Sequence, residues 1–98
     1  MHEYHKIKKT VVELLLNNGY RECTKDTETD YCGSMQCIYA NGKSRFMVFW
    51  DGEEGFGGVE EYKGKGQGEM LKPIVPEAGE DLVQKNISEL LTNIQRLL

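Results

Sequence analysis

The sequence predicts a single α+β domain in which an N-terminal helix, an antiparallel sheet of three to four strands and a C-terminal helix follow one another. Two patterns carry this prediction. Apolar residues recur every three or four positions near both ends of the chain, and strand-like runs divided by turn residues fill the middle. The third observation is length, because 98 residues build one hydrophobic core and leave no room for a second. Residues 1–98 are therefore predicted to form one domain.

The helical patterns lie at the two ends of the chain. Near the N-terminus the apolar stripe consists of Tyr4, Ile7, Val11, Leu14 and Leu15. Val12 and Leu16 lie outside this stripe, and the sequence Asn17-Asn18-Gly19 then ends the helix. The second helix begins after Pro76 with acidic residues in its first turn. Its stripe is the most regular in the chain: Val83, Ile87, Leu90, Ile94 and Leu97.

Three main strands are predicted between the helices, at residues 31–40, 44–50 and 56–63. A short strand at residues 20–25 precedes them, and the polar residues 26–30 form either a turn or an exposed extension of it. A further strand is predicted at residues 69–75. Pro73 cannot donate a hydrogen bond to a neighbouring strand, so this last segment belongs at an edge of the sheet.

The pair Asn41-Gly42 joins two of these strands and is the strongest hairpin signal in the chain. If both residues form a two-residue loop at positive φ, Ala40 opposes Lys43 and Tyr39 opposes Ser44. The core face then pairs Cys37 with Phe46, Met35 with Val48, and Gly33 with Trp50, a large ring over a strand glycine. The other face pairs Ile38 with Arg45, Gln36 with Met47, and Ser34 with Phe49.

The run 46–50 is apolar throughout, whereas a strand with one solvated face should alternate between apolar and polar residues. Both of its faces must therefore be covered, either by one helix on each side of the sheet or by another chain. The apolar side chains that exceed the needs of one two-layer core are Val12, Leu16, Ile38, Met47 and Phe49.

The charge balance limits the classes of partner. The chain has 12 basic and 16 acidic residues, and its net charge of −4 has the wrong sign for direct binding to nucleic-acid phosphates. The sequence shows neither a secretion signal nor a membrane-spanning apolar segment, so we expect a cytoplasmic protein that does not bind membranes. Cys23, Cys32 and Cys37 are then expected to be reduced, and the simplest expectation is that all three are buried.

No pattern in the sequence identifies a reaction, a metal site or a cofactor. The acidic stretches 26–30 and 51–55 lack the residues that a calcium loop requires at its sixth and twelfth positions. The cysteine spacing does not match the paired ligands of a zinc site. The histidines, His2 and His5, lie at a helix start without a partner that would orient a catalytic base. We therefore expect no enzymatic activity; an enzyme would need Cys32 or Cys37 as its nucleophile.

The leading hypothesis is a small protein-binding module, an inhibitor or adaptor, that acts by stoichiometric contact and is homodimeric. Its candidate contacts are the surplus apolar side chains named above. A second candidate set is acidic and consists of Asp51, Glu53, Glu54, Glu60 and Glu61. If the acidic set is the working surface, its target would be a basic site, for example on a nucleic-acid-binding protein.

The alternative hypothesis is a domain that binds a small ligand or nucleotide through the glycine-rich segment 55–68. The residues that would face a phosphate are Lys63, Gly64, Lys65, Gly66 and Gly68. The segment lacks the G-x-x-x-x-G-K-[ST] pattern, and no predicted helix follows it to direct amide groups at a phosphate.

Overall fold

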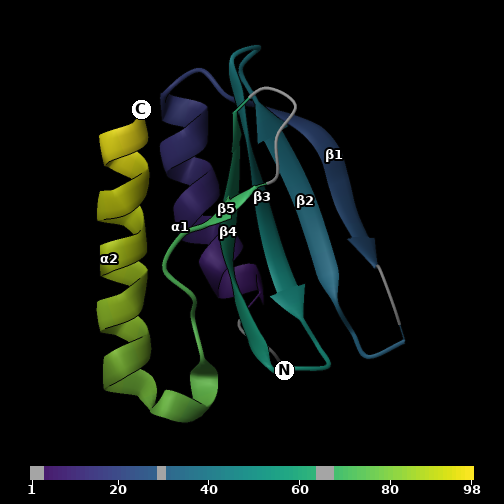
Figure 1. Ribbon diagram of the computed structural model, residues 1–98, viewed down its shortest axis with the longest axis vertical. Helices are drawn as coiled ribbons and strands as arrows, with labels where there is room; N and C mark the ends of the chain where they lie inside the picture. The colour runs from purple at the N-terminus through teal and green to yellow at the C-terminus, as the bar shows by residue number, and fades with distance from the viewer. Residues whose placement is uncertain (1–3, 29–30, 64–67) are drawn as a thin grey trace.

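The computed structural model describes residues 4–28, 31–63 and 68–98, apart from the Lys63 side chain, and has the predicted α+β order of elements. The helices are α1 (Tyr4–Asn17) and α2 (Glu80–Leu97), and a short 3-10 turn, η1 (Pro76–Ala78), precedes α2. The strands are β1 (Arg21–Glu28), β2 (Met35–Ala40), β3 (Ser44–Asp51), β4 (Phe56–Lys63) and β5 (Glu69–Met70). They form one antiparallel sheet in the order β1-β2-β3-β4-β5, so each strand pairs with its neighbours along the chain (Figure 1).

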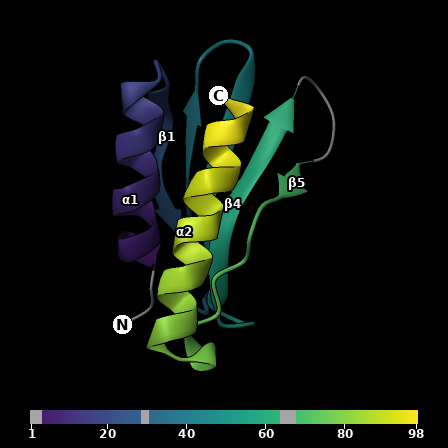
Figure 2. The ribbon, with the colours of Figure 1, turned by 90° about the vertical axis from the view of Figure 1, so that its left-hand side faces the viewer.

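Both helices lie on the same side of the sheet, which we call the inner face (Figure 2). Their stripes meet the inner-face side chains in one core, formed by Tyr4, Ile7, Val11, Leu15, Tyr20, Cys37, Tyr39, Phe46, Val48, Trp50, Val59, Ile74, Val83, Ile87, Leu90 and Ile94. The alternative in which one helix covers each face is therefore wrong. A helix on the opposite, outer face would have to bury Gln36, Arg45 and Glu60, and burying polar groups without partners costs free energy.

The end of α1 follows the sequence prediction. Gly19 has a φ of 84°, the left-handed conformation that glycine adopts without a Cβ clash. The Gly19 amide donates to the Leu16 carbonyl at 3.3 Å, and the Tyr20 amide donates to the Leu15 carbonyl at 3.0 Å. This pair of bonds is a Schellman motif, which satisfies the last carbonyls of the helix and turns the chain into β1.

The β2–β3 turn forms where predicted, but its register is wrong by two residues. Ala40 pairs with Arg45, and the loop residues are Gly42 and Lys43 instead of Asn41 and Gly42. The cause is the Asn41 side chain, whose Oδ1 accepts hydrogen bonds from the Lys43 and Ser44 amides, each at 3.0 Å. Only Gly42 takes a positive φ in this turn. Because side chains alternate with a period of two, the shift leaves every residue on its predicted face.

The Trp50 ring packs against a strand glycine, as predicted, but the glycine is Gly57 on β4 and not Gly33. A Cβ on Gly57 would lie 2.8 Å from the Phe49 backbone oxygen and 2.8 Å from the Trp50 ring. It would also lie 3.0 Å from Cδ1 of Ile7, a residue of α1. Gly57 thus lets the helix and the tryptophan approach the strand closely. Gly33 precedes β2 and has a φ of 86°.

Two of the predicted strands are shorter in the structure, and a third extends as far as one of its predicted alternatives. β2 begins at Met35 because the chain turns at residues 31–32 and continues outside the sheet to Ser34, whose hydroxyl accepts a hydrogen bond from the Gly52 amide. β1 continues to Glu28, in agreement with the exposed extension. The strand predicted at residues 69–75 is reduced to β5, with one separate bridge between Gly57 and Ile74 beyond Pro73.

A charged cluster ties α1 to the edge strand β1. The Tyr4 hydroxyl and the Lys8 ammonium both donate hydrogen bonds to Oδ1 of Asp26, each at 2.7 Å. Partial burial disfavours ionisation of Asp26, but the hydrogen bonds from Lys8 and Tyr4 outweigh it and hold the pKa of this carboxyl below its usual value. Asp26 therefore stabilises the fold in its ionised form.

Gly57→Ala is expected to lower the free energy of unfolding by about 1–3 kcal/mol, because its Cβ would overlap backbone and ring atoms. Gly58→Ala is the matched control on the same strand, since its Cβ would meet nothing closer than 3.5 Å. Urea unfolding of both variants measures the difference. Equal effects at the two positions would contradict the packing described for Trp50 and Ile7.

Asp26→Asn is expected to lower the free energy of unfolding by about 1 kcal/mol near neutral pH, a small value because the side chain is 32% exposed. The folded-state pKa lies below the unfolded value of about 3.9, so the contribution is complete above that pH and is lost as pH falls through the folded pKa. The difference from the wild type should therefore persist to about pH 5 and shrink below about pH 4. Glu28→Gln, on an exposed side chain of the same strand, is the control and should show a smaller effect near neutral pH.

Candidate functional site: the outer face of the sheet

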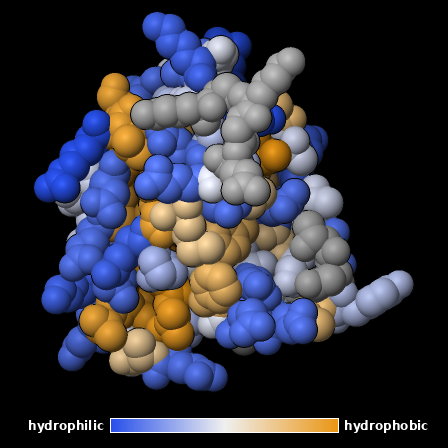
Figure 3. Space-filling view, viewed as in Figure 1, coloured by the Kyte–Doolittle hydropathy of each residue, from blue (hydrophilic) through white to orange (hydrophobic). Residues whose placement is uncertain are grey.

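The outer face consists of the side chains that point away from the helices, as fixed by the strand register. They are Arg21, Thr24, Thr27, Gln36, Ile38, Ala40, Arg45, Met47, Phe49, Asp51, Phe56, Glu60, Tyr62 and Met70. No helix of the described chain covers these side chains. In Figure 3, which shows this side of the molecule, apolar surface lies in the middle of the view between hydrophilic side chains.

An apolar belt runs from the middle of the outer face toward its Asp51 end and consists of Ile38, Met47, Phe49 and Phe56. Ile38 pairs with Met47, and the rings of Phe49 and Phe56 meet edge to face with their centroids 5.7 Å apart. All four side chains are only half-buried. The belt borders a hollow of about 350 Å³, whose lining includes Met47, Phe49 and Phe56 together with the carboxylates of Asp51, Glu53 and Glu60.

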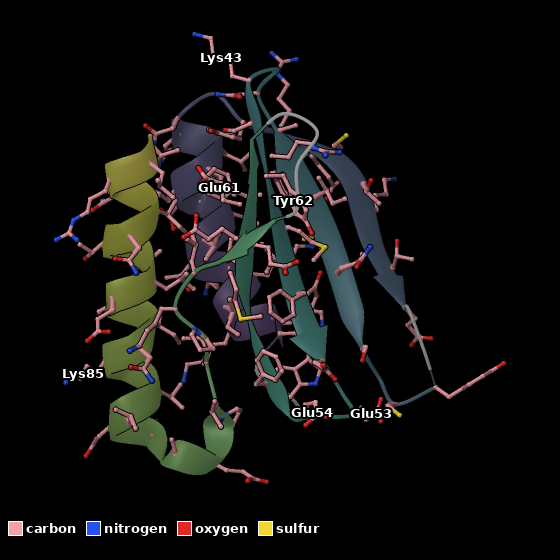
Figure 4. All side chains as sticks on the ribbon, in the orientation of Figure 1. Lys43, Glu53, Glu54, Glu61, Tyr62 and Lys85 are labelled. Atoms are coloured by element: carbon pink, nitrogen blue, oxygen red, sulfur yellow. The ribbon has the colours of Figure 1, made fainter. Side chains whose placement is uncertain are left out.

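The two ends of the outer face carry opposite charges. Lys43 and Arg45 lie at the β2–β3 turn, and Arg21 lies at the same end of the sheet because it pairs with Ala40; the three are exposed and form the basic end. The acidic end is the β3–β4 turn and consists of Asp51, Glu53 and Glu54. In Figure 4, Lys43 lies at one end of the sheet and the two glutamates lie at the other.

The acidic end is shaped by Asp51 itself. Its Oδ1 accepts hydrogen bonds from the Glu53 and Glu54 amides, each at 3.0 Å, and the Gly55 amide donates to its backbone carbonyl at 2.8 Å. Asp51 therefore folds the turn that carries the two exposed glutamates.

At the basic end, Arg45 lies over the ring of Tyr62, with its guanidinium carbon 5.5 Å from the ring centroid. The Tyr62 hydroxyl donates a hydrogen bond to Oε2 of Glu60 at 2.9 Å. Partial burial, reinforced by this bond to a carboxylate, raises the pKa of Tyr62, so the phenol stays protonated near neutral pH. The three side chains hold one another in place on the outer face.

The structure divides the predicted contact residues among separate surfaces. Ile38, Met47 and Phe49 share the outer face, as the alternation of the strands predicted. Val12 and Leu16 lie on α1, where Val12 packs against the core and Leu16 is 52% exposed beside an apolar hollow of about 420 Å³.

The acidic set is divided as well. Asp51, Glu53 and Glu54 lie together in the β3–β4 turn, and Glu60 lies on the outer face. Glu61 lies on the inner face, on the helix side of β4 (Figure 4), and is 6% exposed. It therefore does not belong to the same surface as Glu60. Adjacent residues of a strand point to opposite faces, which separates this pair.

Sequence reasoning missed Arg21, Phe56 and Tyr62 as outer-face residues. Alternation along β4 could have placed Phe56 and Tyr62 on one face, because they are six residues apart. Arg21 could not be placed this way, because bulges between Glu22 and Thr27 shift the register of β1.

The residues of the alternative ligand site fall mostly outside the described part of the chain. Residues 64–66 and the Lys63 side chain are not among the described positions. Gly68 is described, and its backbone lies against the Tyr62 ring so closely that a Cβ would come within 2.5 Å of it. The next element is the strand β5.

The expectation of three buried thiols is wrong for two of them. Cys37 is fully buried in the core, whereas Cys23 and Cys32 are exposed. Cys23 lies in a bulge of the edge strand, and Cys32 lies in the turn before β2. Burial raises the pKa of the Cys37 thiol, which lowers its thiolate population and makes it a poor nucleophile.

Within residues 4–28, 31–63 and 68–98, no helix is long and apolar enough to cross a bilayer, and no three His, Cys, Asp or Glu side chains gather as metal ligands. The chain matches no protein-family model, and no curated protein or solved structure is significantly similar to it. The geometry and chemistry of the outer face are therefore the features that bear on its function.

Cysteine labelling in the native state is expected to modify Cys23 and Cys32 and to spare Cys37. In a Cys23→Ser/Cys32→Ser variant the remaining thiol should react only as fast as the protein unfolds, because its side chain is enclosed by the core. Mass spectrometry with a thiol reagent at about pH 7, with and without urea, measures both rates. Rapid native labelling of Cys37 would contradict its burial and reopen the nucleophile hypothesis.

Proposed function

We propose that this chain is a protein-binding module that acts by stoichiometric contact, as an inhibitor or adaptor does, and that the outer face is its contact surface. One observation carries the proposal. The sheet presents an apolar belt with charged ends on the face that neither helix covers. An exposed apolar patch rimmed by polar side chains is typical of a protein interface.

The composition of the belt supports a protein partner. Phe49 and Phe56 are its aromatic anchors, and the arginines Arg21 and Arg45 lie at its rim. Aromatic side chains, methionine and arginine are the types enriched at protein interfaces. The flat arrangement of the belt on a sheet also suits a broad partner surface better than a compact ligand, which binds in a deep, enclosed pocket.

The acidic end of the outer face indicates what charge a partner would carry. The acidic end, with Glu60 beside the hollow, would attract a basic site on another protein through complementary charge.

We further propose a cytoplasmic location. Two exposed thiols, Cys23 and Cys32, are compatible with a compartment that keeps cysteines reduced.

Phe49→Lys is expected to weaken partner binding by about 30-fold or more, because a central aromatic anchor contributes about 2 kcal/mol. The matched control is Leu16→Lys, which places the same charge on an exposed apolar residue of α1, away from the outer face. Affinity purification with each variant as bait, followed by titration of the recovered chain, measures the effect. Circular dichroism and thermal melting establish that both variants are folded.

The proposal predicts that the wild type and Leu16→Lys bind the same chain in a fixed ratio and that Phe49→Lys does not. Binding that is equally weakened by both lysines, or unaffected by Phe49→Lys, would place the interface elsewhere. If the wild type binds no protein, including itself, at about 100 μM, the proposal is wrong.

A further inference from the structure

We propose that the partner of the outer face is a second copy of the chain, stacked face to face about a two-fold axis that lies between the two sheets and crosses their strands. This inference rests on the proposed function, because it names the occupant of the same surface. It follows from the order in which charged and apolar side chains lie along β3 and β4.

The outer face is electrically polar along its strands. The basic end (Arg21, Lys43 and Arg45) and the acidic end (Asp51, Glu53 and Glu54) are separated by β3. Eight residues of extended chain span about 26 Å. This separation is about three Debye lengths at physiological salt, so the two ends do not neutralise each other within one chain.

Symmetry allows two simple ways to stack the face on its own copy. In both, the two-fold axis lies in the plane between the sheets, because the faces must point toward each other. An axis along the strands puts the basic ends together and the acidic ends together, and like charges repel. An axis across the strands reverses one copy, so that each basic end faces an acidic end. Charge complementarity selects the second arrangement.

The residues along the two central strands fit this arrangement in detail. On β3 the outer-face positions are Arg45, Met47, Phe49 and Asp51, and their midpoint lies between Met47 and Phe49. An axis crossing there places Arg45 of one copy over Asp51 of the other. It also places Met47 over Phe49, so apolar side chains meet at the centre, and sulfur–aromatic contacts are favourable.

The neighbouring strand follows the same rule. On β4 the outer-face positions are Phe56, Gly58, Glu60 and Tyr62, with their midpoint level with that of β3. The axis places Tyr62 over Phe56 of the other copy and Glu60 over Gly58. The carboxylate at the centre of the face is therefore not placed against its own copy, and it keeps its hydrogen bond from Tyr62.

The size of the face is adequate for a dimer. The strands β1 to β4 lie about 4.8 Å apart, and they are about 26 Å long except for β2, which is about 20 Å long, so they cover a footprint of about 480 Å² on each copy. Side-chain relief makes the accessible area larger than this footprint. Specific interfaces begin at about 600 Å² per partner, so the face falls at the lower end of that range. A dimer of moderate affinity is expected.

Charge reversal tests the arrangement, with sedimentation equilibrium of the full chain as the measurement. Lys43→Glu/Arg45→Glu makes both ends acidic and should weaken the dimer by about 10-fold or more. Adding Glu53→Lys/Glu54→Lys to that variant gives the acidic end a net positive charge and should recover about 3-fold or more of the lost affinity. Recovery is incomplete because the acidic residue 45 then lies over Asp51 of the other copy. Both variants lose the contact between Arg45 and Tyr62, so the pair is matched in that respect. Asp51 is left unchanged because it folds the turn.

Three results together support the inference. The wild type dimerises and raised salt weakens its dimer, the first variant loses dimer affinity, and the second variant recovers it. If Lys43→Glu/Arg45→Glu leaves the dimer affinity unchanged, or if raised salt strengthens the dimer, the crossed arrangement is overturned. A wild type that remains at the monomer mass of 11.2 kDa up to about 100 μM overturns the dimer itself. In that last case, binding of a different chain that Phe49→Lys abolishes keeps the proposed function, and absence of any such chain removes both.

Discussion

The packing of both helices against the inner face of the sheet is the constraint on which the rest of this structure depends. α1 lies over the centre of the sheet because Gly57 lets Ile7 and the Trp50 ring approach the backbone of β4. α2 then buries its stripe against α1 and the same core. With both apolar stripes used on one side, the outer face keeps Met47 and Phe49 without a helix above them. The outer-face apolar side chains of β3 are in surplus because both helices pack on the inner face.

The same strand also separates the charges that give the outer face its direction. In the turn at each end of β3, one side-chain oxygen accepts hydrogen bonds from two backbone amides. This oxygen belongs to Asn41 at one end and to Asp51 at the other. The neutral side chain of Asn41 lies in the turn of Lys43 and Arg45, and the carboxylate of Asp51 lies in the turn of Glu53 and Glu54. Turn chemistry and surface charge thus reinforce each other. This arrangement makes the reversed stacking of two copies electrostatically favourable and the parallel stacking unfavourable.

Local sequence signals predicted local structure well. Asn17-Asn18-Gly19 ends α1 with the expected glycine at positive φ, and β4 has its predicted bounds, Phe56 to Lys63. The hairpin at Asn41 was placed correctly, but a two-residue register error arose because the sequence does not reveal that Asn41 would accept amide hydrogen bonds instead of taking a positive φ itself. The burial of the thiols was also misjudged. Hydrophobicity alone does not distinguish Cys37 in a central strand from Cys23 in a bulge of the edge strand.

The sequence by itself determined the α+β class, the order of elements and the inward or outward direction of each β3 side chain. These properties depend on spacing between near neighbours: 3.6 residues per turn in a helix and two in a strand. Only the tertiary structure decided that both helices share one face and that Glu61 is buried while Glu60 is not. It also decided that Arg21 joins Arg45 at one end of the sheet. Those properties depend on contacts between residues far apart in the chain, and periodicity carries no information about which distant surfaces meet.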